Sequence, residues 1–417
     1  MKSGYSHMKC GLLGEHLGHS FSPQIHSELA DYSYELFEVE PNGVEAFVKN
    51  GTLDAYNVTI PYKKTVMPFL DVISPEAQAI GSVNTVVRKN GKLYGYNTDY
   101  FGFNHMIDAS GIEPTGKKAI VFGTGGASVT VCAVLRDRGV SELCVIGIED
   151  NTKENLIKHK DAQIIVNATP VGMYPKNLES PVDLSLFPEC EGVLDVVYNP
   201  ARTALLLDAE KRNIAYSGGL SMLVAQAVKA FEFFTGDTAE DGITDKILQS
   251  VAATTQNLIL VGMPGCGKST LGKLLAKKLG RPFFDADDEF TSTYGVTPAN
   301  VITEQGEEKF RQMEHDVLCE LGKKSGAVIS CGGGAVTREY NYEPLHQNGV
   351  IIFLERALEN LSTHGRPLSQ KSNVQELYAA RIDKYHRFAD IEVKSTEIPD
   401  KTADAVIDAL VGFRYVR

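Results

Sequence analysis

The segment Gly262-Met263-Pro264-Gly265-Cys266-Gly267-Lys268-Ser269-Thr270 has the residue types and spacing of a phosphate-binding loop. It follows the apolar run 258–261 and precedes a helical pattern over 271–279. Glycines allow the backbone to curl so that successive N–H groups face one concavity, and the N-terminus of the next helix adds partial positive charge. The lysine reaches outer phosphates and the serine hydroxyl binds magnesium in such loops. A chance glycine turn is disfavoured because strand, spacing and helix agree. We expect a nucleoside triphosphate site formed by Gly265, Cys266, Gly267, Lys268, Ser269 and Thr270.

A second glycine-rich turn, Gly123-Thr124-Gly125-Gly126-Ala127, follows the apolar run 118–122 and opens a helical pattern. It is a variant of the dinucleotide-binding turn that lacks the third glycine at its usual spacing. Its position between a strand and a helix favours binding of a dinucleotide pyrophosphate over a plain strand-to-helix turn.

Four polar segments precede that turn, at 18–23, 57–63, 81–85 and 95–99. Their hydroxyl and amide side chains both donate and accept hydrogen bonds, as a site for a polyhydroxylated acid requires, and a wrong ligand would leave them unpaired. The segments also contain Lys63 and Asp99. An ammonium beside a carboxylate can donate a proton to a developing alkoxide and take it back in the reverse direction. A solvated lysine, and turn or cap roles for the small polar residues, are the alternatives.

Length and composition indicate a globular protein of two or three domains, with 417 residues, 43% apolar and 23% charged. The net charge of −12 argues against binding of nucleic acid or an anionic membrane, so any basic phosphate site must be local. Seven scattered cysteines form no C-x-x-C pair, which predicts neither a zinc site nor a disulfide framework. Without a signal core or a membrane span, we expect a cytoplasmic protein with reduced thiols.

Short apolar runs alternate with helical patterns, which predicts α/β units with parallel sheets. In the first half, strands are predicted at 9–14, 34–39, 55–60, 118–122, 143–148, 164–167 and 193–197. The expected domains are a substrate-binding lobe (1–104), a dinucleotide-binding lobe (105–240) whose C-terminal helix near 221–235 packs back on the first lobe, a linker (241–256) and a phosphate-loop domain (257–417).

Together with Asn167-Ala168-Thr169-Pro170-Val171-Gly172-Met173 and Met222-Leu223-Val224-Ala225-Gln226-Ala227, the motifs of the first half resemble shikimate dehydrogenase, from about Met8 to about Thr235 and in the family's order. That family reduces 3-dehydroshikimate with a nicotinamide cofactor. The resemblance implies that Lys63 is the acid/base with Asp99 as its partner, and that the turn 123–127 takes the pyrophosphate. It places Tyr198 and Gly219 beside the nicotinamide and substrate. The implied substrate-binding residues are Ser20, Ser22, Thr59, Lys63, Asn84, Asp99, Tyr198 and Gln226.

One segment departs from that family. Where the family usually shows Asn-Arg-Ser/Thr, whose arginine meets the 2′-phosphate of NADP, this chain has Ile146-Gly147-Ile148-Glu149-Asp150-Asn151 and no basic residue until Lys153. A carboxylate at Glu149 or Asp150 would repel a 2′-phosphate and could accept a hydrogen bond from a free ribose hydroxyl. The cofactor is therefore expected to be NADP or NAD, with a weakened preference for NADP.

Downstream of the phosphate loop, charged residues and a glycine triplet recur within short motifs. They are Phe284-Asp285-Ala286-Asp287, Arg311 within 306–314, the triplet in 330–336, Arg366 within 365–368, and Arg381. Arginines bind a planar carboxylate in a bidentate fork, and the triplet allows close backbone approach to a ligand. An arginine on a mobile loop can close over a transferring phosphate. Surface ion pairs and a flexible loop are the alternatives.

Residues 257–417 resemble shikimate kinase over their whole length. The resemblance implies that Ser269 and Asp285 serve Mg²⁺, and that Asp287 orients or deprotonates the acceptor hydroxyl beside the catalytic Lys268. It also implies that Arg311 and Arg381, next to Gly333, bind the shikimate carboxylate, and that Arg366 is a lid arginine near ATP.

The two resemblances suggest a bifunctional enzyme of the shikimate pathway, which leads to chorismate and the aromatic amino acids. Its first half would reduce 3-dehydroshikimate with NAD(P)H and its second would phosphorylate shikimate with ATP. Its partners would be small molecules. Alternatively, the first half is a quinate/shikimate dehydrogenase or a degenerate ligand-binding module, with only the kinase active. A kinase for gluconate or nucleosides is also open, although Arg311 and Arg381 favour an acceptor with a carboxylate.

Overall fold

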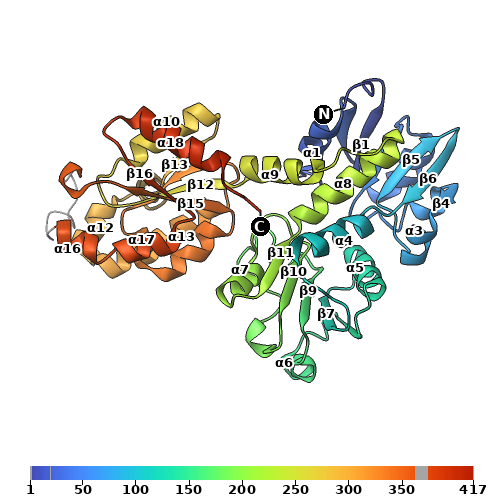
Figure 1. Ribbon diagram of the computed structural model, residues 1–417, viewed down its shortest axis with the longest axis horizontal. Helices are drawn as coiled ribbons and strands as arrows, with labels where there is room; N and C mark the ends of the chain where they lie inside the picture. Colours follow the sequence, from blue (N-terminus) through green and yellow to red (C-terminus); the bar gives the residue numbers. More distant parts are fainter. Residues whose placement is uncertain (1, 19, 362–373, 417) are drawn as a thin grey trace. The chain divides into compact units, whose positions relative to one another are not determined.

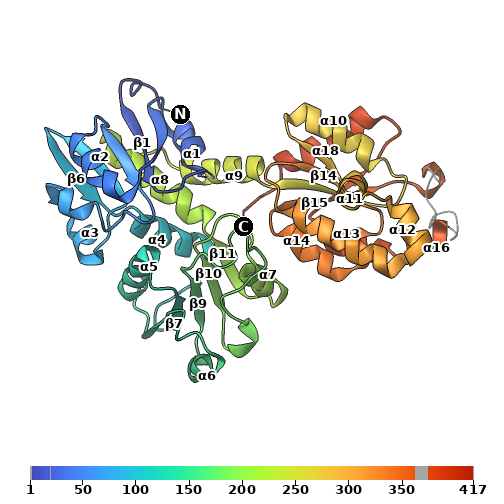
Figure 2. The same ribbon diagram turned by 180° about the vertical axis from the view of Figure 1, so that it is seen from behind.

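The computed structural model describes residues 2–18, 20–361 and 374–416. The chain divides into two compact units between Val251 and Ala252. Figures 1 and 2 show the helices and strands of each unit from opposite sides. No helix in the described ranges is long and apolar enough to cross a membrane.

The first unit begins with a six-stranded sheet in the order β2-β1-β3-β5-β6-β4. β1 pairs in parallel with β2 and β3, but β5 runs antiparallel to β3 and β6, so this sheet is mixed and not parallel as expected. Asn90 (φ 53°) and Gly91 (φ 74°) form a two-residue turn whose twist suits an antiparallel hairpin. The strands are β1 (Lys9–Gly14), β2 (Ser33–Glu38), β3 (Ala55–Val58), β4 (Val72–Ile73), β5 (Thr85–Lys89) and β6 (Lys92–Tyr96).

Helices cover this sheet with residues from distant parts of the chain. Residues of α2 (Val44–Asn50) and α3 (Pro75–Ile80) share a buried core with β1 and β3. Helix α8 (Leu220–Thr235) follows the second sheet in the sequence, yet it contacts α1 (Ser22–Leu29), β3 and β5.

The second sheet of the first unit has five parallel strands in the order β11-β10-β9-β7-β8. One face packs against α4 (Asp99–Ser110) and α5 (Gly126–Asp137), and the other against α7 (Ala204–Lys211). The predicted strands 118–122 and 164–167 are confirmed to the residue. The strands are β7 (Lys118–Phe122), β8 (Glu142–Ile146), β9 (Ile164–Asn167), β10 (Gly192–Asp195) and β11 (Ala215–Gly218).

Helices α4 and α8 lie side by side and tie the two sheets together (Figures 1 and 2). A Cβ on Gly102 would lie 2.5 Å from the carbonyl oxygen of Met222 and 3.0 Å from Cβ of Gln226. Only a glycine permits this approach, because real Cβ atoms do not come so close to a backbone oxygen. The contact brings the start of α4, with Asp99, next to the turn of α8 that carries Gln226.

The segment expected as a linker, 241–256, contains helix α9 (Ile243–Thr255). Ile247 and Val251 are fully buried, and the Ser250 hydroxyl donates to Oε1 of Glu28 at 2.8 Å. The division between the two units falls within this helix. Its periodic apolar residues pack as in other amphipathic helices.

The second unit contains a five-stranded parallel sheet in the order β13-β14-β12-β15-β16. Helices α10 (Lys268–Leu279) and α18 (Pro399–Val411) lie on one face, and α13 (Glu307–Gly322) and α17 (Ile382–Phe388) on the other (Figure 1). Strands buried on both faces read as continuous apolar runs, as in Leu258–Val261. The strands are β12 (Asn257–Val261), β13 (Phe283–Asp285), β14 (Val328–Ser330), β15 (Gly349–Glu355) and β16 (Ile391–Lys394). This unit also contains α11 (Ala286–Tyr294), α12 (Pro298–Gln305), α14 (Tyr342–His346) and α16 (Val374–Ala379), and the first unit also contains α6 (Lys153–Leu156).

Gly102→Ala should destabilise the first unit by about 1–3 kcal/mol, because the added methyl must push α4 away from the backbone of α8. Calorimetric or denaturant unfolding measures the effect. Gly18→Ala is the control: its Cβ would meet no heavy atom within 4 Å in the described structure. Equal stability of the two variants would contradict the packing argument.

Candidate active sites

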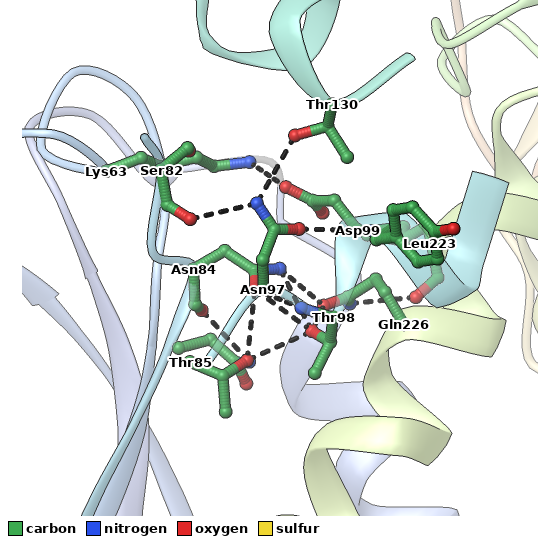
Figure 3. A network of polar contacts seen from close by, with 12 residues as sticks. Lys63, Ser82, Asn84, Thr85, Asn97, Thr98, Asp99, Thr130, Leu223 and Gln226 are labelled. Atoms are coloured by element: carbon green, nitrogen blue, oxygen red, sulfur yellow. Dashed lines mark hydrogen bonds and ion pairs between the residues drawn. The ribbon is translucent and has the colours of Figure 1, made fainter. Parts of the chain in front are cut away.

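Lys63 and Asp99 form an ion pair in the first unit (Figure 3). Lys63 Nζ lies 2.6 Å from Asp99 Oδ2, and the side chains are only 16% and 8% exposed. Lys63 follows β3, and Asp99 is the first residue of α4, where the helix N-terminus favours a carboxylate. Partial burial strengthens the attraction relative to a surface pair. The structure thus brings together the two charged residues that the sequence indicated.

Amides and hydroxyls from three elements form a buried network next to this pair (Figure 3). Asn84 Nδ2 donates to Thr98 Oγ1 (3.0 Å) and to Gln226 Oε1 (3.4 Å), while Asn84 Oδ1 accepts from the Thr98 amide (2.6 Å). Gln226 Nε2 donates to the carbonyl of Leu223 (2.8 Å). Each amide therefore has a defined orientation, as polar recognition of hydroxyl groups requires.

The remaining substrate candidates lie around the carboxyl ends of β1 and β3. The Ser20 hydroxyl accepts from the Ser22 amide at 3.2 Å, and Ser22 opens α1. The Thr59 carbonyl accepts from the Tyr62 amide at 2.9 Å, which places Thr59 on the turn leading to Lys63. Ser20 and Ser22 flank Phe21, whose ring centroid is 5.4 Å from that of Tyr198. Tyr198 follows β10, so this contact joins the two sheets of the unit.

The glycine turn after β7 leaves space for a ligand. Gly123 has a φ of +112°, and a Cβ there would lie 2.9 Å from the Ala168 carbonyl oxygen. A Cβ on Gly125 would meet no described heavy atom within 4 Å, and one on Gly126 would meet only Cδ of Lys63, at 4.0 Å. Thr124 is exposed, and Ala127 lies in the first turn of α5. The turn is therefore open, and it lies next to Lys63.

Gly219 also permits a close approach. A Cβ there would lie 2.1 Å from the Val196 carbonyl oxygen, and its amide donates to Val197 at 3.0 Å. The loop that carries Tyr198 is thereby held against the start of α8.

Asp195 is a buried residue that our reading of the sequence did not single out. Its Oδ1 accepts from Asn167 Nδ2 and the Val197 amide, both at 3.0 Å, and its Oδ2 accepts from the Thr203 hydroxyl at 2.6 Å. Burial raises the pKa of Asp195 to about 7 from its ordinary 3.8. The carboxyl group anchors both ends of the loop that carries Tyr198. The only sequence signal was an acidic residue at the end of an apolar strand.

The edge of the sheet beyond β8 carries acidic and apolar side chains. A Cβ on Gly147 would lie 3.7 Å from Asp150 Oδ2 and 3.5 Å from Thr124 Cγ2. The Asp150 carboxylate and Thr124 of the glycine turn therefore both lie next to Gly147. Glu149 is exposed, and Ile148 is 95% exposed.

In the second unit, the loop between β12 and α10 has the strained backbone that glycine tolerates, with φ +86° at Gly265 and +97° at Gly267. Lys268 Nζ donates to the carbonyls of Gly262 (2.9 Å) and Met263 (3.1 Å). Cys266 is buried, whereas Ser269 and Thr270 are exposed in the first turn of α10.

The Ser269 hydroxyl lies 3.4 Å from that of Ser330, and Ser330 pairs in register with Asp285. The Asp285 side chain accepts from the Asp287 amide at 3.1 Å, because strand β13 ends at Asp285 and α11 starts at the next residue. Ser269, Asp285 and Asp287 thus gather near the carboxyl ends of β12, β13 and β14.

The glycine triplet 332–334 packs directly against charged side chains and the phosphate loop. A Cβ on Gly332 would lie 2.7 Å from Glu314 Oε1 and 3.5 Å from Asp287 Oδ1. One on Gly333 would lie 2.6 Å from Pro264 Cγ, and one on Gly334 would lie 2.1 Å from Arg311 Nη2. The Gly333 carbonyl accepts from Arg381 Nη1 at 3.0 Å and from the Tyr385 hydroxyl at 2.5 Å.

Glu314 is a second residue that we did not single out from the sequence. Its Oε2 accepts from Arg311 Nη1 at 2.7 Å, and both side chains are nearly fully buried (5% and 3% exposed). Burial raises the pKa of Glu314, an effect that Arg311 partly offsets. Burial lowers the pKa of Arg311, but the carboxylates of Glu314 and Glu307 more than compensate. The i,i+3 spacing of Arg311 and Glu314 was visible in the helical pattern. Arg366 lies outside the described residues.

These geometries define the class of each unit. The first is a two-sheet α/β unit with a dinucleotide-type glycine turn beside a lysine–aspartate pair. The second is a phosphate-loop kinase fold with an arginine-lined site next to the loop.

Comparison with known proteins agrees with this division. The family model "Shikimate dehydrogenase substrate binding domain" matches residues 12–86, and "Shikimate 5'-dehydrogenase C-terminal domain" matches 219–249. The model "Shikimate kinase" matches 264–411.

Among the similar proteins is a shikimate dehydrogenase (NADP(+)) from Clostridium beijerinckii. It is 37% identical to this chain over 268 residues, and the match covers 59% of this chain and 97% of that protein. The solved shikimate dehydrogenase 1 of Peptoclostridium difficile is 36% identical, with a TM-score of 0.53, and the match covers 58% of this chain and 97% of that one. The Listeria monocytogenes shikimate 5-dehydrogenase, solved with shikimate and NAD, is 31% identical with a TM-score of 0.51, over 58% of this chain and 95% of that one. The chain belongs to the shikimate dehydrogenase family and carries a shikimate kinase domain after its dehydrogenase unit, so it is an enzyme with both kinds of domain.

The raised pKa of Asp195 predicts a pH-dependent stability. The folded state holds this proton more tightly than the unfolded chain, so the stabilisation is present at low pH and is lost as the pH rises through about 7. Relative to Asp195→Asn, which does not titrate, the wild type should lose several degrees of Tm between about pH 5 and about pH 8. Differential scanning calorimetry measures this.

Asp183→Asn is the control for that experiment. Hydrogen bonds from Ser185 lower the pKa of Asp183, so its contribution should stay constant over the same range. A difference between wild type and Asp195→Asn that did not change with pH would contradict the prediction.

Proposed function

We propose that the first unit reduces 3-dehydroshikimate to shikimate with a reduced nicotinamide dinucleotide, and that the second phosphorylates shikimate with ATP to shikimate 3-phosphate. One observation carries the first assignment: Lys63 pairs with Asp99 at 2.6 Å while its Cδ lies 4.0 Å from the Cβ position of Gly126 in the open glycine turn. The proposed acid/base group, Lys63, therefore lies next to the glycine turn that is proposed to bind the cofactor. The Listeria relative was solved with both ligands of such a reaction.

In the first unit, Lys63 donates a proton to the carbonyl oxygen of the substrate as that oxygen gains charge. Asp99 orients the ammonium through their ion pair. Asn84 and Gln226, held by their network, bind the substrate hydroxyls with Ser20, Ser22 and Thr59. Tyr198 and Gly219 border the place where the two reactants meet. The nicotinamide supplies the hydride, and the open turn at 123–127 fits its pyrophosphate.

In the second unit, the loop amides and Lys268 hold the phosphates of ATP, together with Gly265, Cys266, Gly267 and Thr270. Ser269 and Asp285 would hold Mg²⁺, for which hydroxyl and carboxylate oxygens are suitable ligands. Asp287 orients or deprotonates the acceptor hydroxyl. Arg311 and Arg381, aligned by Glu314 and the Gly333 carbonyl, bind the acceptor carboxylate. Catalysis here is positioning and charge neutralisation.

The two activities should be separable by single substitutions. Lys63→Met removes the proton donor and should lower dehydrogenase kcat by about 10²–10⁴, with kinase activity unchanged. Asp287→Asn should abolish most kinase turnover, with the reduction unchanged. An assay with 3-dehydroshikimate, reduced nicotinamide, ATP and Mg²⁺, read by nicotinamide absorbance and by formation of shikimate 3-phosphate, measures both.

In each variant, the activity of the unsubstituted unit is the control and should equal that of the wild type. A folded wild type that reduces no 3-dehydroshikimate, or a Lys63→Met variant with full reductase activity, would refute the assignment of the first unit. Turnover of quinate in place of shikimate by the wild type would favour the alternative substrate.

We also propose that Asp150 selects against the 2′-phosphate of NADP. Its carboxylate lies on the side of Thr124 and the glycine turn, and an acidic side chain at this edge accepts a hydrogen bond from a free ribose hydroxyl. The named Clostridium relative is of the NADP type, so this is a difference expected of the present chain.

Asp150→Ser should raise kcat/KM for NADPH relative to NADH about tenfold or more, because it removes the repulsion between two anions. Fluorescence titration of both dinucleotides with the enzyme checks the same ratio without turnover. Glu149→Ser, the adjacent exposed carboxylate, is the matched control and should leave the ratio within about twofold. A wild type that strongly prefers NADPH would reject the idea.

A further inference from the structure

Arg356 is a cation beside the phosphate loop that belongs to none of the motifs described above. It directly follows β15, the strand that pairs with β12, and β12 leads into the loop. Its side chain is half-buried, and its Nη1 lies 3.6 Å from the position a Cβ would take on Gly267. The guanidinium therefore packs on the loop at the residue before Lys268.

Within the described part of the second unit, the guanidinium of Arg356 has no hydrogen bond or ion pair, in contrast to the other arginines. Those have carbonyl or carboxylate partners: Arg281, Arg311, Arg338, Arg381, Arg387 and Arg414. A half-buried guanidinium has lost part of its hydration and normally gains compensating hydrogen bonds. A ligand that accepts hydrogen bonds would provide the partner that the Arg356 guanidinium lacks among the described residues.

The electrostatic setting specifies the charge of that ligand. Lys268 is 8% exposed, and its Nζ donates to the carbonyl oxygens of Gly262 and Met263 and to Cys266 Sγ, with no carboxylate partner among the described residues. Two cations therefore flank Gly267, together with the N-terminus of α10. Cations, inward-facing amides and a helix N-terminus produce a positive potential that an anion relieves. In a chain of net charge −12, this is a local concentration of positive charge.

We propose that Arg356 binds the α- or β-phosphate of the nucleotide, as a second cation beside Lys268. The glycine triplet and Pro264 lie on the β14 side of the loop, so Arg356 approaches from the opposite, β15 side. The planar guanidinium can donate two parallel hydrogen bonds to phosphate oxygens. The proposal rests on the kinase function proposed above and adds a residue to its nucleotide site.

A contact to phosphates that are not transferred has a defined kinetic signature. The contact is made equally in the ground state and the transition state, so its loss raises KM for ATP and leaves kcat nearly unchanged. A residue acting on the transferred phosphate would instead lower kcat. A merely structural residue would change the affinities for ATP and for the acceptor together.

The test is calorimetric titration of the full chain with ADP and, separately, with shikimate. Arg356→Gln should weaken ADP binding about tenfold or more and reduce its salt dependence, with shikimate affinity and kcat unchanged within about threefold. Arg356→Lys should fall between wild type and Arg356→Gln, because it keeps the charge without the fork. Arg387→Gln is the matched control, since Arg387 is exposed and lies 3.6 Å from Glu339; it should bind ADP normally.

Unchanged ADP affinity in Arg356→Gln, or equal losses for ADP and shikimate, would overturn the proposal. Wild-type chain that binds ADP but transfers no phosphate would refute the kinase function and leave the test of Arg356 intact. Wild-type chain that binds no ADP would refute the nucleotide site itself.

Discussion

Close backbone approach at a few glycines is the constraint on which both units depend. At Gly102, Gly219 and Gly334, a Cβ would lie between 2.1 and 2.5 Å from a backbone oxygen or from the Arg311 guanidinium. Two of these three obstacles are backbone atoms, which cannot swing aside like the end of a flexible side chain. The missing side chains allow α4 to meet α8, the Tyr198 loop to meet the start of α8, and Arg311 to reach the glycine triplet. A side chain at any of these glycines would displace the neighbouring polar groups by several tenths of an ångström or more.

The parallel strands add a second ordering principle. In the parallel sheet of each unit, the candidate site residues lie where the strands end, because parallel strands present their carboxyl ends at one edge. Asn167, Asp195 and the turn at 123–127 meet there in the first unit, as do Ser269, Asp285 and Ser330 in the second. The Lys63–Asp99 ion pair is positioned in another way. Asp99 starts helix α4, which links the two sheets, so Lys63, which follows β3 of the first sheet, is held beside the glycine turn of the second.

The charged side chains of the two units differ in the partners that they bind. Lys63 has a carboxylate partner, and Arg311 is neutralised by Glu314 in a nearly dry environment. Burial makes such a pair costly to break from one side, because the remaining charge would be left alone. Lys268 bonds to two carbonyl oxygens and to Cys266 Sγ, with no carboxylate partner among the described residues, which suits the phosphate site proposed for it. Under the proposed functions, the product of the first unit is the acceptor of the second, and fusion supplies the two activities in equal amounts.

Local sequence determined most of the chemistry. The two glycine turns lie in strand–turn–helix segments that depend on neighbouring residues alone. Short local motifs also contain Lys63, Asp99, Asp285, Asp287 and the arginines proposed to bind the acceptor carboxylate. Asn90-Gly91 and the i,i+3 spacing of Arg311 and Glu314 are local signals too, but we predicted neither the hairpin nor the ion pair from them. Helix α9 was not anticipated because its polar composition resembled a linker, and burial of one apolar side decided its structure.

Tertiary structure alone decided the rest. Asp195 bonds to Asn167 and Thr203, and Arg356 lies against Gly267, 89 positions earlier in the chain. Such contacts follow from the order of strands in a sheet, and no local pattern encodes that order. The sequence by itself therefore specified which groups were present at each site, whereas their partners, burial and charge environment required the sheets to bring distant segments to one edge.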